Sequence, residues 1–243
     1  MQNDRLMNKY DKLQARKRSW TPTKPTAGRL VEGSEEVIFR ALALRQLELP
    51  VGEFISSACK GDIPEESRSL LESNITDEVK HDQALGFVAD ALGTDLNSEK
   101  VAANITSLWE KHPDHTVLKA MVLERSIFFV LLPFFRFNGD AGLRTVSADI
   151  SRDEQVHVAA NSLVCRELGL TLSPSLDALR KATIQWVMSP LKRSDNKYLD
   201  RQFWIDQSDS LMYSGKAEGL IETQRARMPA FFEHANSNLP SYS

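Results

Sequence analysis

One spacing pattern occurs twice in this chain of 243 residues, and it constrains the fold more than any other feature. A glutamate is followed 30 residues later by a Glu-x-x-His segment, and a glycine follows 15 residues after that second glutamate. The residues of the two copies are Glu48, Glu78, His81 and Gly93, and then Glu124, Glu154, His157 and Gly169. Thirty residues span one helix, a turn and a return to the same level of an antiparallel neighbour. The pattern therefore predicts two helical hairpins.

The two hairpins carry residues that suit a metal centre. A glutamate and a histidine three residues apart project from one face of a helix. Packing the hairpins face to face brings four carboxylates and two imidazoles together, as in known two-metal carboxylate bundles. Imidazole suits iron, carboxylates accept iron or manganese, and the missing sulfur argues against an iron–sulfur or structural zinc site. The predicted cofactor is two metal ions, Fe/Fe or Mn/Fe, with Mn/Mn also open. The predicted ligands are Glu48, Glu78, His81, Glu124, Glu154 and His157.

Each of these residues alone has a simpler interpretation. A single glutamate or histidine on a helix is usually a solvated charge, and only the repeated spacing favours ligands. Glu124 also lies in a strongly apolar segment, where an unpaired carboxylate would cost several kcal/mol. Glu53 is a rival to Glu48, but it breaks the 30-residue spacing. The other histidines are expected at the surface: His112, His115 and His234.

Hydrophobic residues recur at helical spacing along most of the chain, which predicts an all-α fold. The expected helices cover residues 34–61, 64–93, 98–111, 116–138, 141–169, 175–188 and 197–215. Pro50 is expected to kink the first of them, just beyond Glu48. The predicted organisation is an N-terminal arm over residues 1–33, a ferritin-like di-metal helical domain over 34–228, and a flexible C-terminal tail over 229–243.

The composition is that of a globular protein with an apolar core. Hydrophobic residues make up 42% and charged residues 26% of the chain, and the net charge is −3. No basic excess indicates a nucleic-acid or membrane-surface partner. The run from Ile127 to Phe135 is too short to span a membrane, and the N-terminus lacks the apolar core of a signal peptide. Cys59 and Cys165 form no metal or redox motif, so they are expected as buried thiols in the cytoplasm.

Several segments resemble one family. The segment Ser151–His157, Ser-Arg-Asp-Glu-Gln-Val-His, is similar to the SRDExxH-type segment of the small subunit of ribonucleotide reductase, the R2-like branch of the ferritin superfamily. Further segments share the resemblance, which runs from about residue 10 to 170: Leu123–Phe129, Tyr10–Asp11, Trp20–Pro22 and Val37–Phe39. The resemblance implies a ferritin-like four-helix bundle with additional helices. It also implies reaction with dioxygen or a reduced oxygen species, a homodimer, and a ribonucleotide reductase large subunit as partner.

The resemblance assigns roles to residues outside the metal ligands. In the family, the aspartate before the second Glu-x-x-His accepts a hydrogen bond from the first histidine ligand and links to an N-terminal tryptophan. The corresponding residues are Asp153, His81 and Trp20. Tyr242, near the C-terminus, could relay an electron between subunits, although an ordinary terminal tyrosine explains it equally well.

The chain also departs from the family pattern. Leu85 occupies the position of the radical-bearing tyrosine, four residues after His81, and Glu48 stands where many members have aspartate. The first hypothesis is therefore a small subunit that stores its oxidising equivalent on the metals. The second is a stand-alone oxidase or oxygenase that acts on a small or lipid-like molecule. The third is a ferritin-like iron store or a metal-binding structural protein without turnover, and the two histidines and the R2-like arm argue against storage.

Overall fold

The computed structural model describes residues 8–216 and residue 220, and every regular element in this part of the chain is helical. The elements are α1 (Lys9–Gln14), α2 (Glu35–Ala43), η1 (Leu44–Leu47), α3 (Glu48–Cys59), α4 (Glu65–Leu92), α5 (Leu96–Lys111), α6 (Thr116–Leu123), η2 (Glu124–Phe128), α7 (Phe129–Asn138), α8 (Ala141–Glu167), α9 (Pro174–Met188), η3 (Lys197–Leu199) and α10 (Arg201–Ser214). The predicted all-α fold is confirmed.

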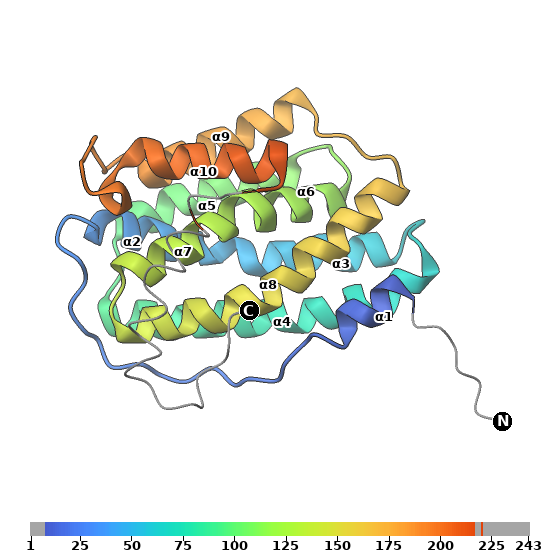
Figure 1. The fold of residues 1–243 in the computed structure, drawn as a ribbon, viewed down its shortest axis with the longest axis horizontal. Helices are drawn as coiled ribbons and strands as arrows, with labels where there is room; N and C mark the ends of the chain where they lie inside the picture. Colours follow the sequence, from blue (N-terminus) through green and yellow to red (C-terminus); the bar gives the residue numbers. More distant parts are fainter. Residues whose placement is uncertain (1–7, 217–219, 221–243) are drawn as a thin grey trace.

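Four helical rods form the central bundle (Figure 1). They are α2 with η1 and α3, then α4, then α6 with η2 and α7, and finally α8. Consecutive rods pack as hairpins, α3 on α4 and α7 on α8, and the hairpins meet through α4 on α8 and α3 on α6. The hairpins predicted from the 30-residue spacing are therefore present. The helices α5, α9 and α10 are additional and pack outside the bundle.

The two longest helices begin and end where the sequence signals it. Glu65 and Glu66 place negative charge in the first turn of α4, next to the positive end of the helix dipole. Asp140 caps α8, because its side chain accepts a hydrogen bond from the amide of Leu143. Gly93 and Gly169 follow the two helices with φ of 90° and 64°, a conformation that favours glycine.

The α-helix of the first rod is interrupted at a different place from the one predicted. A 3₁₀ turn, η1, occupies Leu44–Leu47, directly before Glu48, whereas the kink was expected beyond Glu48 at Pro50. Pro50 lies in the first turn of α3, where backbone amides have no partner within the helix. Its missing amide hydrogen therefore costs little there, and the proline does not disturb the helix.

The third rod contains a π-helical segment that the sequence did not predict. This segment, η2, begins at Glu124 and separates α6 from α7. A π-helix is rare, often occurs at functional sites, and changes the pairing of backbone carbonyl groups. The carbonyl of Ser126 accepts a hydrogen bond from the hydroxyl of Ser208 on α10 at 2.7 Å. The helix α10 thus supports the segment that carries Glu124.

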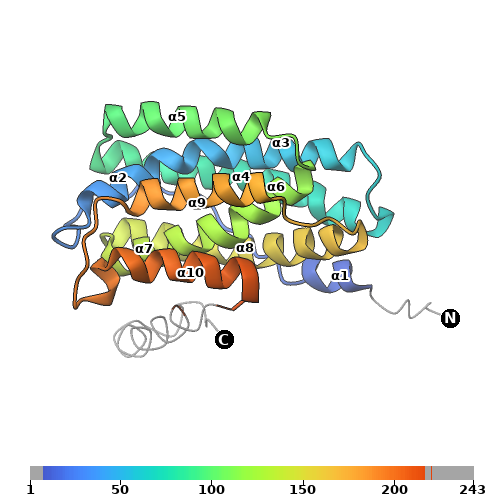
Figure 2. The ribbon, with the colours of Figure 1, turned by 90° about the horizontal axis from the view of Figure 1, so that it is seen from above.

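A buried arginine holds Ser208 in place. Arg180 of α9 is fully buried, and its Nη1 donates to Ser208 Oγ at 2.9 Å. Its Nε and Nη2 donate to Asp177 and Asp209 at 2.9 and 2.7 Å. Figure 2 shows α9 and α10 side by side along the rod that contains α7. The helices beyond residue 170, for which the sequence indicated no role, therefore cover η2.

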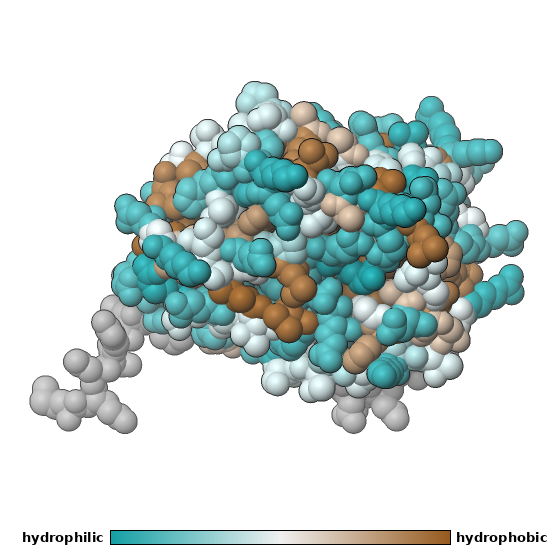
Figure 3. Space-filling view, turned by 180° about the vertical axis from the view of Figure 1, so that it is seen from behind, coloured by the Kyte–Doolittle hydropathy of each residue, from teal (hydrophilic) through white to brown (hydrophobic). Residues whose placement is uncertain are grey.

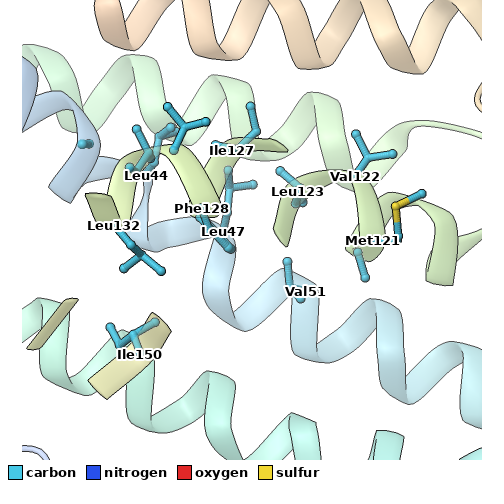
Figure 4. Close-up of a cluster of buried hydrophobic side chains, with 14 of the residues drawn as sticks. Leu44, Leu47, Val51, Met121, Val122, Leu123, Ile127, Phe128, Leu132 and Ile150 are labelled. Atoms are coloured by element: carbon cyan, nitrogen blue, oxygen red, sulfur yellow. The ribbon is translucent and has the colours of Figure 1, made fainter. Parts of the chain in front are cut away.

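Apolar side chains fill the space between the first and third rods. Figure 4 shows Leu47 and Val51 facing the rod that contains Leu123 and Phe128. These four side chains are at most 5% exposed. Their packing fixes the level of α3 against η2, and hence the level of Glu48 against Glu124.

The N-terminal arm does not only lie on the surface. It contains α1, which packs on α4 and α8 with Tyr10 and Leu13 buried. Beyond α1 the arm is extended and runs along the edge of the bundle opposite α9 and α10 (Figure 1).

Seen from behind, the surface is mainly hydrophilic, with hydrophobic residues in separate patches (Figure 3). Among the described residues, no helix is both long and apolar enough to cross a membrane. The predicted tail, 229–243, lies outside the described residues, and the domain boundaries stay predictions.

We predict that Ser208→Ala destabilises the protein by about 1–3 kcal/mol, because it leaves a buried Arg180 N–H and the Ser126 carbonyl without a partner. The free energy of unfolding from urea denaturation measures this loss. Ser214→Ala, at an exposed position of the same helix, is the control and should be nearly neutral. Equal stability of the two variants would contradict a supporting role for Ser208.

Candidate metal centre

All six predicted ligands lie inside the bundle, each at most 2% exposed. Each of the four rods contributes: Glu48 begins α3, Glu124 begins η2, and α4 and α8 carry one Glu-x-x-His segment each. Four of the six form a tight set whose ligand atoms lie within 4.8 Å of one another: Glu78, His81, Glu154 and His157.

Glu78 and Glu154 lie between the two imidazoles. His81 Nδ1 is 3.4 Å from Glu78 Oε2 and 3.3 Å from Glu154 Oε1. His157 Nδ1 is 2.9 Å from Glu78 Oε1 and 3.6 Å from Glu154 Oε1. Both carboxylates therefore reach both histidines, so two ions held by these histidines would share Glu78 and Glu154.

Glu48 and Glu124 lie at opposite ends of this set. Glu48 Oε2 is 3.7 Å from His81 Nδ1, and Glu124 Oε1 is 3.8 Å from His157 Nδ1. Each would serve one ion only. Each imidazole therefore has one glutamate of its own beside it, and Glu78 and Glu154 lie within reach of both imidazoles.

The hydrogen-bonding state of these atoms tests whether a metal centre fits. The inward-facing atoms are buried without a well-directed hydrogen bond: Glu48 Oε2, both carboxylate oxygens of Glu78 and Glu154, Glu124 Oε1, and Nδ1 of His81 and His157. Buried polar groups in proteins are almost always hydrogen-bonded, so a convergent group of orphaned acceptors requires a cause. Two divalent cations would satisfy every one of them. The residues fit a two-metal site.

Burial and charge alter the ionisation of the cluster. Burial raises the pKa of Glu48 and Glu124 well above the ordinary value of glutamate. Burial acts on Glu78 in the same direction, but His157 and His81 offset it and lower the pKa of Glu78 to about 2. The cluster without metal therefore binds protons where ions would bind.

Two aspartates orient the imidazoles. Asp153 Oδ2 lies 3.2 Å from His81 Nε2, and Asp77 Oδ2 lies 3.2 Å from His157 Nε2. A carboxylate can only accept, so Nε2 of each histidine carries the proton and Nδ1 faces the glutamates. Each aspartate directly precedes the glutamate of one Glu-x-x-His segment and contacts the histidine of the other.

The arm contributes Trp20 to this outer layer. The indole Nε1 of Trp20 donates to Asp153 Oδ2 at 2.7 Å, and its ring stacks on His81 with centroids 6.2 Å apart. The three residues named by the family resemblance, Trp20, Asp153 and His81, thus form one connected chain. The assignment of Trp20 and Asp153 as catalytic residues stays a prediction.

Two other residues that touch the site were not predicted. Asp77 could have been found, because Asp-Glu-x-x-His occurs in both segments and Asp153 was assigned. Asn161, which donates to Glu124 Oε2 at 2.6 Å, lies on α8 one turn beyond His157 and gave no such signal.

The remaining candidates are elsewhere. Glu53 is exposed, so it cannot replace Glu48 at the cluster. His115 is exposed, whereas His112 is half-buried, and neither belongs to the clustered set of ligand atoms. Cys59 and Cys165 are buried free thiols, as predicted. Tyr242 and His234 lie outside the described residues.

Comparison with known proteins supports the fold. No family model matches the sequence, and no curated protein does. Among solved structures, the chain is similar to a provisionally assigned class I ribonucleotide reductase from Bacillus halodurans, with a TM-score of 0.57 and 15% identity. The similarity covers 83% of this chain and 87% of that chain. At this identity it concerns the fold alone, and it supports the predicted R2-like, ferritin-like helical bundle.

We predict that Glu48→Ala lowers the affinity for Fe²⁺ or Mn²⁺ by about 10-fold or more, since removing an outer partner already costs that much at other sites. Metal content after dialysis against a weak chelator measures the loss. Glu53→Ala, five residues along the same helix, should bind metal like the wild type. Equal loss in both variants would refute the choice of Glu48.

The raised pKa of Glu124 leads to a second prediction. A carboxyl whose folded-state pKa is raised contributes stability that is fully present below pH 4.5, the ordinary glutamate value, and is lost as the pH rises from there through the folded-state pKa. Glu124→Gln keeps a neutral group there, so the metal-free variant should be more stable than the metal-free wild type at pH 7, and the difference should shrink towards pH 4.

Metal should reverse this order. In the wild type, ions at about 100 times their Kd add about 2.7 kcal/mol of stability, and the variant should gain less. Thermal unfolding with and without Mn²⁺ measures both effects. A metal-free variant that is less stable than the wild type at pH 7 would show that Glu124 has a structural rather than a ligating role.

Proposed function

We propose that this protein is an oxygen-activating di-metal redox protein, and specifically the oxidant-generating small subunit of a ribonucleotide reductase. The observation that carries the proposal is the convergence of six buried ligands whose inward-facing atoms lack other partners. The fold shared with the ribonucleotide reductase structure supports it. The chain of contacts from His81 through Asp153 to Trp20 provides a connection from the cluster to the arm.

Each protein group has a defined task in this proposal. Bound iron or manganese ions would supply the electrons that reduce dioxygen. Glu48 and Glu124 at the ends of the cluster, and Glu78 and Glu154 between the imidazoles, would provide the carboxylate ligands. Asp153 and Asp77 keep the proton on Nε2 of the two histidines, so that Nδ1 stays available as a ligand. The indole of Trp20 is an oxidisable side chain in hydrogen-bond contact with Asp153.

Leu85 determines where an oxidising equivalent can reside. It is 4% exposed and lies on α4, four residues beyond His81. An aliphatic side chain cannot hold a radical. We therefore assign the stored oxidant to the metals, or to direct transfer from them to a substrate.

Leu85 also favours a second candidate function, a stand-alone oxidase or oxygenase that acts on a small or lipid-like substrate. A protein of this class needs no tyrosine beside the metals and no large subunit. Co-purification with a nucleotide-binding large subunit supports the first candidate, and oxidation of an added apolar substrate by the isolated chain supports the second.

We predict that aerobic loading of the protein with Fe²⁺, or with Mn²⁺ and Fe²⁺, leaves no tyrosyl radical. The only tyrosines of the chain are Tyr10, Tyr198, Tyr213 and Tyr242, and none belongs to the ligand-bearing segments. Electron paramagnetic resonance after oxygen exposure should show metal-centred signals alone. Leu85→Tyr is the informative variant, and a phenoxyl signal in it but not in the wild type supports the assignment. A sharp phenoxyl signal in the wild type would overturn it.

We also propose that the chain forms a homodimer, as the family resemblance implies. Leu49 and Val79, large apolar residues 46% and 54% exposed, lie on the packed helices α3 and α4. Apolar residues on adjoining helices are a suitable centre for a two-fold interface. Light scattering should give a dimer mass at micromolar concentration, and Leu49→Glu with Val79→Glu should lower it. A monomeric wild type would reject the proposal.

A further inference from the structure

The N-terminal arm reaches both of the aspartates that orient the imidazoles. Trp20 Nε1 donates to Asp153 Oδ2 at 2.7 Å, and Lys17 Nζ lies 2.5 Å from Asp77 Oδ2. Asp153 contacts His81, and Asp77 contacts His157. Two arm residues only three positions apart therefore each support a different imidazole of the cluster.

The environment of Lys17 is a built site rather than a surface ion pair. The lysine side chain is 13% exposed and that of Asp77 is 6% exposed. The ammonium group also donates to Ser73 Oγ at 2.7 Å and Asn74 Oδ1 at 3.0 Å. An ammonium has three donors, so Lys17 uses all of them on α4. Its neighbours Arg16 and Arg18 are exposed.

We propose that Lys17 is a positioning residue for the metal centre: it fixes Asp77, which in turn fixes His157. The proposal rests on the metal centre of the proposed function but not on any reaction with oxygen. Asp77 lies between two ammonium groups, because Lys80 Nζ contacts its Oδ1 at 2.5 Å. With both oxygens held, the carboxylate cannot rotate away from His157 Nε2. Loss of Lys17 frees one oxygen, the one that His157 uses.

The rest of the arm is anchored independently, so a change at Lys17 alone should not release it. The amide of Gly28 donates to Asp140 Oδ2 at 2.7 Å, and the amide of Val31 donates to the carbonyl of Asn138 at 2.9 Å. Gly142 lies directly under the arm, where an added Cβ would be 2.5 Å from Pro25 Cβ. The effect of Lys17 on the cluster can therefore be measured in a folded protein with a docked arm.

The test is an anaerobic titration of the metal-free full-length chain with Mn²⁺, in which electron paramagnetic resonance counts the unbound ion. Lys17→Met should lower the affinity for one of the two ions by about 10- to 100-fold, the usual cost of losing an outer partner. The affinity for the other ion should stay nearly unchanged. Trp20→Phe, which removes the indole N–H, should also lower the affinity for one ion, and the double variant should lower the affinity for both. Arg18→Met is the matched control and should behave as the wild type, while Lys17→Arg should keep most of the affinity.

A double-mutant cycle identifies the ion concerned. Lys17→Met should add nothing in a His157→Ala background, because the group on which it acts is gone, and should keep its effect in a His81→Ala background. The reverse pattern would overturn the inference, and so would wild-type affinity for both ions in Lys17→Met. Equal weakening of both ions would also overturn it, since that result indicates general loosening.

The same titration separates this inference from the proposed function. A wild-type chain that takes up no Mn²⁺ would remove the metal centre and the inference together. Uptake of two ions with no effect of Lys17 would overturn the inference alone. Uptake with the predicted effect of Lys17, but no oxidation on exposure to oxygen, would sustain the inference and reject the oxygen chemistry.

Discussion

The burial of four carboxylates around two imidazoles is the constraint on which the rest of this structure depends. Negative charge inside a protein is costly unless it is paired, and here the glutamates outnumber the imidazoles by two to one. The bundle therefore needs added positive charge at its centre, as protons or as metal ions. Apolar side chains fill the space between the first and third rods, and the two aspartates hold the histidines.

The fold and the ligand set could be predicted because helical geometry converts sequence spacing into spatial proximity. Glu48 and Glu124 stand at the same interval before their Glu-x-x-His segments, and Gly93 and Gly169 end both helices at the same interval after them. The irregular turns could not be predicted in this way. Leu44–Leu47 and Glu124–Phe128 have ordinary helix-compatible sequences. The π segment also receives a hydrogen bond from Ser208, a contact between distant residues that no local pattern signals.

Contacts between segments that are distant in the sequence could not be predicted either. Lys17 belongs to a basic run that has the pattern of a solvated arm, and only the fold shows that one of its three charges is buried against α4. Trp20 was connected with Asp153 through the family resemblance alone, because 133 residues separate the two. Asp77 shows the opposite situation: its position in the repeat was visible, but its role required the distance to His157.

The two halves of the cluster match in their glutamates and histidines, but the aspartates that hold the two histidines have different partners. On one side Asp153 is paired with a neutral indole N–H, and Lys80 is 3.9 Å away. On the other, Asp77 is paired with two ammonium groups at 2.5 Å. The charge of Asp77 is therefore more fully compensated than that of Asp153, and more negative charge remains beside His81 than beside His157. The only oxidisable side chain that donates to these two aspartates, Trp20, also lies on the His81 side within the described structure. The two halves of the cluster thus match in their glutamates and histidines but differ in the charge of the groups that hold their aspartates, and the arm's indole lies on the less compensated side.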